Sequence, residues 1–111
     1  MSATSKRIAQ IILPKFDNDG NSLVWHHQTY QKAFAYHYGG FTAYDVRGGW
    51  MNEDGKMFHD ESVAYHIAMD DNNGNIEKFR GLAQAAAGEF QQECIFIALP
   101  NGDVEFITTE G

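Results

Sequence analysis

The sequence Val63-Ala64-Tyr65-His66-Ile67-Ala68-Met69 alternates large apolar side chains with smaller or polar ones. Successive side chains of a β-strand point to opposite faces of a sheet, so this period of two predicts a strand with one heavily buried face. The segments on either side of the strand indicate what covers that face.

Helical patterns lie on both sides of this strand. Downstream, the turn cluster 70–75 precedes a stripe of apolar residues at the 3.6-residue period, with Asn75 as the expected cap: Ile76, Phe79, Ala83, Ala86 and Phe90. Upstream, Ser22 is placed to cap a helix that ends at Gly39-Gly40 and carries a second stripe: Leu23, His27, Tyr30, Phe34 and Tyr38. We expect two helices.

Further strands are predicted over 8–13, 41–51 and 94–99, with residues 56–59 returning along the second strand and a hairpin at 100–103 leading to 104–108. The order strand, helix, strand, strand, helix, strand matches the ferredoxin-like βαββαβ plan. The predicted fold class is therefore α+β, an antiparallel sheet with two helices on one face and an extra C-terminal hairpin strand.

The 111 residues are expected to form a single domain, 1–111, with a core from about 7 to 108. The chain contains no apolar run of the ~20 residues that a membrane helix needs and no apolar region near the start, which favours the cytoplasm, or the host cytoplasm if a phage encodes it. The net charge of −7 disfavours nucleic acid and anionic membranes as partners.

No spacing typical of a metal or cofactor site is present. His26 and His27 lie about 16 Å from His37 at ~1.5 Å per helical residue, so they cannot share one ion. HExxH, CxxC and phosphate-binding glycine motifs do not occur, and the acidic turns lack the EF-hand register. The sequence therefore predicts no metal, no cofactor and no identifiable catalytic residue, with Cys94 as a small buried residue.

Charge is unevenly distributed along the chain. Seven acidic residues lie between Asp45 and Asp71, whereas residues 22–38 contain no acid. On the predicted first helix, Trp25 and Tyr36 fall on the side away from the core, near Lys32. Exposed tryptophan and tyrosine are typical interface anchors, so these three residues are the predicted surface for a host protein or for self-association.

A ligand site is expected on or beside the sheet face that the helices leave open. Tyr44 and Arg47 lie on opposite faces of one strand, so only one of them joins a given site. If the larger side chains of 63–69 face the helices, His66 lies on the open face between two alanines, where it can act as a general base or contact a ligand.

The segment from Gly39-Gly40-Phe41-Thr42 to Gly48-Gly49-Trp50, followed by Asp60-Glu61 and by Gln91-Gln92-Glu93, resembles a family of small uncharacterised phage and bacterial domains of unknown function. The resemblance implies a ferredoxin-like α+β module in a phage setting and nominates four residues: Thr42, Gly49, Trp50 and Glu61. The alternative is structural, with Trp50 anchoring the hairpin and Gly48-Gly49 forming a bulge.

These observations give a leading hypothesis and two alternatives. The leading hypothesis is a non-enzymatic, self-associating binding protein, a phage accessory or counter-defence protein that modulates a host component. The first alternative is a binder of a small molecule or a nucleotide signal through Arg47, Tyr44 or His66. The second, which the absence of catalytic motifs disfavours, is a small dimeric ferredoxin-like enzyme with a pocket around His66.

Overall fold

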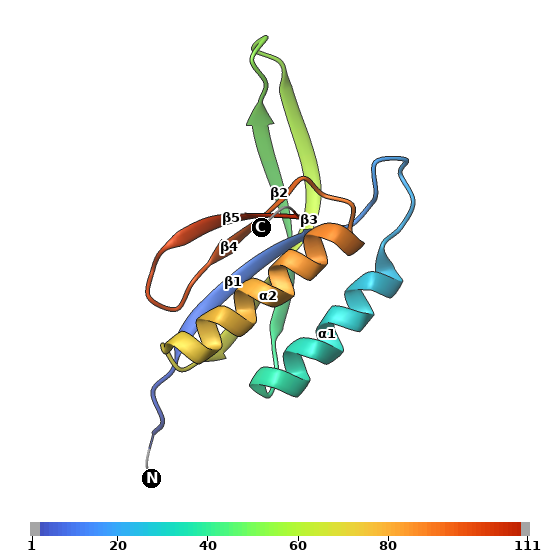
Figure 1. Cartoon of the computed structure of the whole chain (residues 1–111). Coiled ribbons are helices and arrows are strands. Elements are labelled where there is room, and N and C mark those ends of the chain that lie inside the picture. Colours follow the sequence, from blue (N-terminus) through green and yellow to red (C-terminus); the bar gives the residue numbers. More distant parts are fainter. Residues whose placement is uncertain (1–2, 110–111) are drawn as a thin grey trace.

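The computed structural model describes residues 3–109. Its elements follow the predicted order (Figure 1): β1 (Arg7–Pro14), α1 (Val24–Tyr38), β2 (Thr42–Met51), β3 (Met57–Met69), α2 (Asn73–Glu89), β4 (Cys94–Ala98) and β5 (Val104–Thr108). Within this part of the chain, no helix is both long and apolar enough to cross a membrane.

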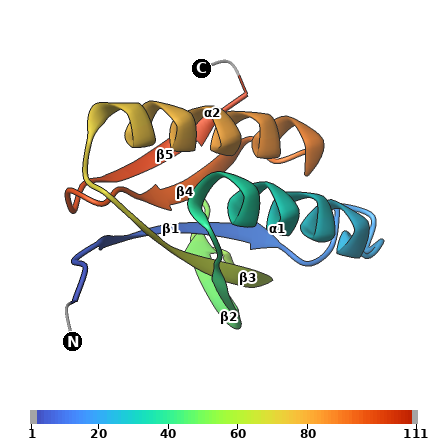
Figure 2. The same cartoon turned by 90° about the horizontal axis from the view of Figure 1, so that it is seen from below.

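The strands form one antiparallel sheet in the order β2-β3-β1-β4-β5, and both helices lie on the same face of it (Figure 2). The added strand β5 pairs only with β4, at the edge. The predicted fold class, a ferredoxin-like α+β plan with an extra C-terminal strand, is confirmed.

The alternation in β3 sorts its side chains as predicted. Tyr65 and Ile67 are fully buried and lie opposite the buried residues Ile11 and Ala9 of β1, on the face that the helices cover. The helices add Phe34, Phe79 and Phe90 to the same core. His66 lies on the open face, opposite Gln10, with Ala64 and Ala68 on either side.

Three local predictions are corrected. The cap of α2 is Asn72, not Asn75, because the extended backbone of Asn72 lets its Oδ1 accept the Asn75 N–H at 2.9 Å. The cap position of α1 is Leu23, and Ser22 Oγ accepts only the Val24 N–H, at 3.3 Å. Cys94 is exposed, because its position in the alternation of β4 places it on the open face.

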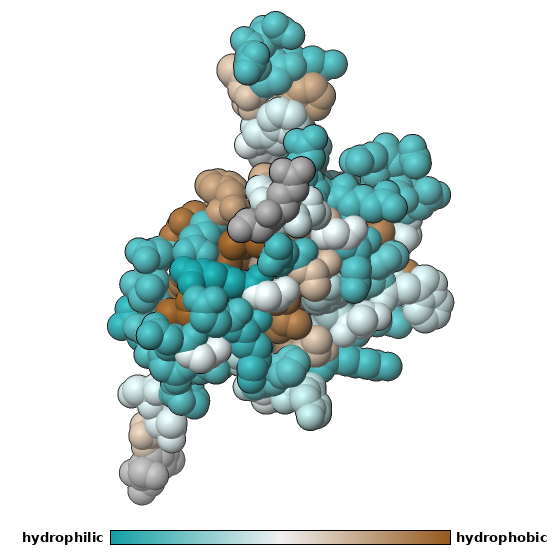
Figure 3. Space-filling view, in the orientation of Figure 1, coloured by the Kyte–Doolittle hydropathy of each residue, from teal (hydrophilic) through white to brown (hydrophobic). Residues whose placement is uncertain are grey.

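β2 and β3 continue beyond the rest of the sheet as a two-stranded ribbon. β3 is one strand from Met57, whereas β1 pairs with it only from Ser62 onward. The ribbon stands clear of the body, with a hydrophilic tip and hydrophobic surface directly beneath the tip (Figure 3). Its register is regular through Gly48 and Gly49, so the predicted bulge is absent.

Candidate functional site

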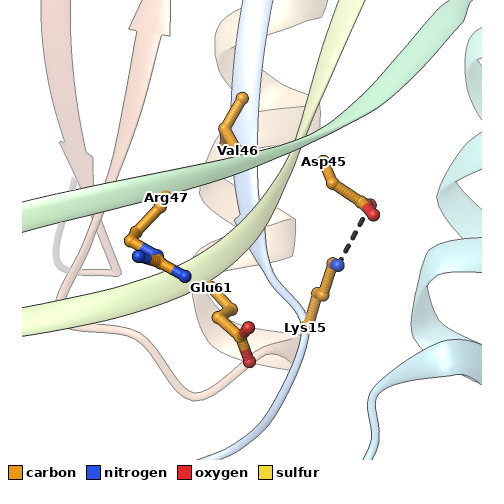
Figure 4. A pocket seen from close by; sticks show the side chains of 5 residues that line it. All are labelled: Lys15, Asp45, Val46, Arg47 and Glu61. Carbon is orange, nitrogen blue, oxygen red and sulfur yellow. Dashed lines mark ion pairs between the residues drawn. The ribbon is translucent and has the colours of Figure 1, made fainter.

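An open, charged depression of about 380 Å³ lies where the ribbon leaves the body (Figure 4), and its residues Asp45, Arg47 and Glu61 are exposed. We call it the ionic pocket, and it is lined by Lys15, Asp45, Val46, Arg47 and Glu61. Lys15 follows β1 in the chain. Asp45, Val46 and Arg47 belong to β2, and Glu61 belongs to β3. Three segments distant in sequence therefore supply its charges.

Backbone pairing fixes these segments. The Lys15 N–H donates to the Glu61 carbonyl at 3.0 Å, and the Lys15 carbonyl accepts the Leu23 N–H at 2.9 Å. Arg47 and Glu61 are directly opposite each other in the β2–β3 ladder. Asp45 lies two residues from Arg47 and therefore on the same face.

The pocket contains two positive and two negative side chains, and only one positive and one negative side chain form an ion pair with each other. Lys15 Nζ lies 3.0 Å from Asp45 Oδ1. Arg47 and Glu61 extend toward the same cavity (Figure 4), and neither forms an ion pair with any residue in 3–109. A guanidinium and a carboxylate that face one depression without forming an ion pair are complementary to a ligand that carries both charges.

The other predicted ligand residues lie on the opposite face. Thr42 is paired with His66, and Tyr44 Oη lies 2.6 Å from His66 Nε2. Gln10 completes this cluster, with its Nε2 2.7 Å from His66 Nε2. Gln10 was not predicted from the sequence, because only the β1–β3 register brings it beside the histidine. The predicted ligand set is thus divided between the two faces of the sheet.

Trp50 lies on the ribbon, away from both clusters. Its ring stacks on Phe58 with centroids 4.6 Å apart and an interplanar angle of 16°. Lys56 Nζ lies 5.1 Å from the centre of the Phe58 ring. This environment fits the structural alternative, in which Trp50 anchors the hairpin.

The predicted interface residues of α1 separate as well. Trp25 and Tyr36 are 74% and 85% exposed, in the orientation expected, and their role as an interface stays a prediction. Lys32 lines a second cavity, of about 290 Å³, which we call the amide pocket; its other residues are Gln28, Gln31, Ala35 and Phe41. These four residues were not predicted from the sequence, because glutamines on an exposed helix face resemble any solvated surface.

A chain of buried and partly buried hydrogen bonds connects the core to Gln31 in the amide pocket. His27 Nε2 lies 2.7 Å from the Pro14 carbonyl oxygen, and His27 Nδ1 lies 2.6 Å from Tyr65 Oη. Gln31 Nε2 donates to Tyr65 Oη at 3.1 Å. Burial lowers the pKa of His27 and raises that of Tyr65, so both groups are neutral near pH 7.

No group of three or more histidine, cysteine or carboxylate side chains within residues 3–109 is arranged to hold a metal ion. The ionic pocket can bind a ligand through its charged side chains. The amide pocket places the apolar side chains of Ala35 and Phe41 beside the amides of Gln28 and Gln31.

Solved structures of a phage SAM lyase have the same fold. The complex of that enzyme with S-methyl-5′-thioadenosine superposes with a TM-score of 0.75 and 18% identity, covering 99% of this chain and 96% of the other. The apo state gives a TM-score of 0.71 at 18% identity, covering 100% and 97%. No family model and no curated protein sequence matches.

These matches correct the functional expectations. The prediction of a non-enzymatic binding protein is wrong, and so is the inclination against an enzyme, because the solved structures that share the fold over the whole chain are those of an enzyme. That enzyme comes from a phage, which agrees with the expected phage setting, whereas no domain family of unknown function is confirmed. The neighbour's bound thioadenosine agrees with a small-molecule ligand.

Proposed function

We propose that this protein is an enzyme that cleaves S-adenosylmethionine (SAM) at a carbon–sulfur bond, with the ionic pocket holding the amino acid end of the substrate. One observation carries the proposal: the fold matches a phage SAM lyase over essentially the full length of both chains. The charges of the ionic pocket give this chain a site suited to such a substrate.

The chemistry of the substrate explains what such a site must do. S-methyl-5′-thioadenosine is what remains of SAM when the bond between the sulfonium sulfur and the amino acid arm breaks. The sulfur takes the bonding electrons and leaves as a neutral thioether, so the leaving group needs no proton. The carbon that loses the sulfur forms a new bond to an oxygen of the arm's own carboxylate, which closes the arm into a lactone. Catalysis then depends on holding the arm in a reactive geometry, a positioning effect that contributes ~7–11 kcal/mol in favourable cases.

The unpaired charges of the ionic pocket are suited to this positioning. The Arg47 guanidinium can donate two hydrogen bonds to the substrate carboxylate, and the Glu61 carboxylate can accept hydrogen bonds from the ammonium group. Lys15 and Asp45 form an ion pair with each other, which leaves Arg47 and Glu61 as the charges of the pocket that are available to the substrate. The substrate arm would thereby be held between β2 and β3.

Removal of SAM would withdraw the methyl donor from methyltransferases in the same compartment. Because host methyltransferases would lose their methyl donor, the proposal includes a counter-defence role. Self-association through Trp25, Lys32 and Tyr36 also remains a prediction.

The test is incubation of the purified protein with SAM, followed by quantification of S-methyl-5′-thioadenosine by liquid chromatography and mass spectrometry. We expect the product to form, and the variants Arg47→Gln and Glu61→Gln each to lower kcat/KM by about 10–100-fold, since each loses a charge-assisted contact of roughly 1.5–3 kcal/mol.

Matched controls are Lys78→Gln and Glu93→Gln, which remove the same charges at exposed positions outside the ionic pocket. These should retain wild-type kcat/KM. Failure of the folded wild type to convert SAM, or SAM binding without turnover, would contradict the proposal. Equal losses in the control variants would place the site elsewhere.

A further inference from the structure

The amide pocket lies along the same side of β2 as the ionic pocket. Phe41, Ala43, Asp45 and Arg47 alternate along the chain, and Phe41 packs edge-on against Tyr65, which lies opposite Ala43 on the helix-covered face. Phe41 lines the amide pocket and Arg47 lines the ionic pocket. From Phe41 to Asp45 the strand rises about 13 Å at ~3.3 Å per residue, with only the alanine side chain between them.

The buried hydrogen bonds fix which atom of Gln31 remains free. The Pro14 carbonyl can only accept, so His27 Nε2 carries a proton, and neutral His27 Nδ1 accepts the Tyr65 hydroxyl proton. Tyr65 Oη then accepts from the Gln31 amide nitrogen. The chain is therefore directed, and Gln31 Oε1 is left as a hydrogen-bond acceptor.

We propose that the amide pocket is the adenine subsite of this enzyme, with the purine ring against Phe41 and its exocyclic amino group donating to Gln31 Oε1. This inference rests on the proposed function, because it assigns the second end of the same substrate. The 5′ arm that carries the sulfonium runs past Ala43 toward the ionic pocket.

The directed chain makes the subsite selective between purines. Adenine presents a donor at its 6-position, whereas hypoxanthine presents an acceptor there. An acceptor held against Gln31 Oε1 leaves both oxygens without a partner, which costs more than a missing contact. Gln31 is thus the specificity-determining residue, and Tyr65 acts as a positioning residue through it.

The experiment measures binding of S-methyl-5′-thioadenosine and its inosine analogue by isothermal titration calorimetry. We expect the wild type to bind the adenosine compound at least about tenfold more tightly than the inosine compound. Phe41→Leu should weaken adenosine binding about tenfold through loss of the stacking surface. The matched control Phe106→Leu, at an exposed position on β5, should change it less than about twofold.

Tyr65→Phe tests the directed chain, because it frees the Gln31 amide to rotate. In protein shown to be folded by circular dichroism, it should reduce the preference for adenosine over inosine to less than about threefold. An unchanged preference would overturn the role of Tyr65 and Gln31.

Three further results would overturn the subsite: no adenosine binding by the wild type, equal binding of the two compounds, or unchanged binding by Phe41→Leu. The outcomes also separate the two proposals. Binding that depends on Phe41 without cleavage of SAM would reject the enzyme but keep the purine site. Cleavage of SAM that does not depend on Phe41 would support the enzyme but reject the purine site.

Discussion

The hydroxyl of Tyr38 is a buried polar group at the C-terminal end of α1. Among residues 3–109 its oxygen has no hydrogen-bond partner, although the ring packs against Phe79. Burial raises the pKa of this hydroxyl to about 12. A buried hydroxyl without a partner costs free energy that its removal recovers.

Tyr38→Phe should therefore leave the free energy of unfolding unchanged or raise it by up to about 1 kcal/mol. Urea denaturation of the two proteins at pH 7 measures the difference. Tyr65→Phe is the contrasting variant, because it removes a hydroxyl that has partners, and it should destabilise the fold. Destabilisation by Tyr38→Phe of more than about 1 kcal/mol would show that its hydroxyl is satisfied.

His27 makes the stability depend on pH. Burial lowers its pKa in the folded state below the ordinary value of 6.5, so the unfolded chain binds a proton more readily than the folded one. Its contribution is fully present above pH 6.5 and is lost as the pH falls from there through the lowered pKa. Urea midpoints should therefore be lower at pH 5 than at pH 7.5.

The control for this pH effect is His37→Gln, on the exposed side of the same helix. It should preserve the difference between the two urea midpoints, whereas His27→Gln should reduce that difference. An identical pH dependence in His27→Gln would refute the assignment. The carboxyl groups whose pKa is lowered, Asp17 and Glu105, have ordinary values near 4 and titrate below this range.

At the scale of elements, the β2–β3 ribbon is the segment with the least support. Over residues 57–61, β3 pairs with β2 alone and has no second neighbouring strand. An isolated two-stranded hairpin is only marginally stable in water. The stack of Trp50 on Phe58 is the main side-chain contact across its outer part, and aromatic pairs of this kind contribute about 0.5–1.5 kcal/mol.

Trp50→Ala should therefore open the ribbon locally. Amide hydrogen exchange of residues 48–58 should speed up by roughly 2–10-fold, while exchange in β1 and the inner half of β3 changes little. Met51→Ala, the adjacent exposed position on the other face, is the control and should have a smaller effect. Equal protection of the ribbon in Trp50→Ala and wild type would contradict the anchoring role.

At the scale of the whole molecule, the order of the elements follows from local patterns. The alternation around Tyr65 and the helical stripe through Phe79 are short-range signals, and they predicted which faces form the core. The predicted cap of α2, Asn75, lies three residues from the observed cap, Asn72. Several asparagines in this turn satisfy the same preference, and only the backbone conformation selects Asn72. Cys94 was predicted to be buried but is exposed, because the alternation of the short strand β4 places it on the open face.

The candidate site was only partly predictable. Arg47 and His66 were nominated from the strand pattern, and Glu61 only from the family resemblance. The placement of Lys15 beside Asp45 and of Gln10 beside His66 joins residues 30 and 56 positions apart. No local motif marks such a site, because it consists of common charged and polar side chains that the strand register brings together. The inclination against an enzyme came from that lack of a motif.

Periodicity and turn residues act over a few neighbours, so they were sufficient to predict the α+β class, the element order, the buried face of β3 and the exposure of Trp25 and Tyr36. Local patterns could not show that Arg47 and Glu61 face one depression, or that His27, Tyr65 and Gln31 form a directed chain. Strand register and helix docking set these contacts, and both depend on packing of the whole chain.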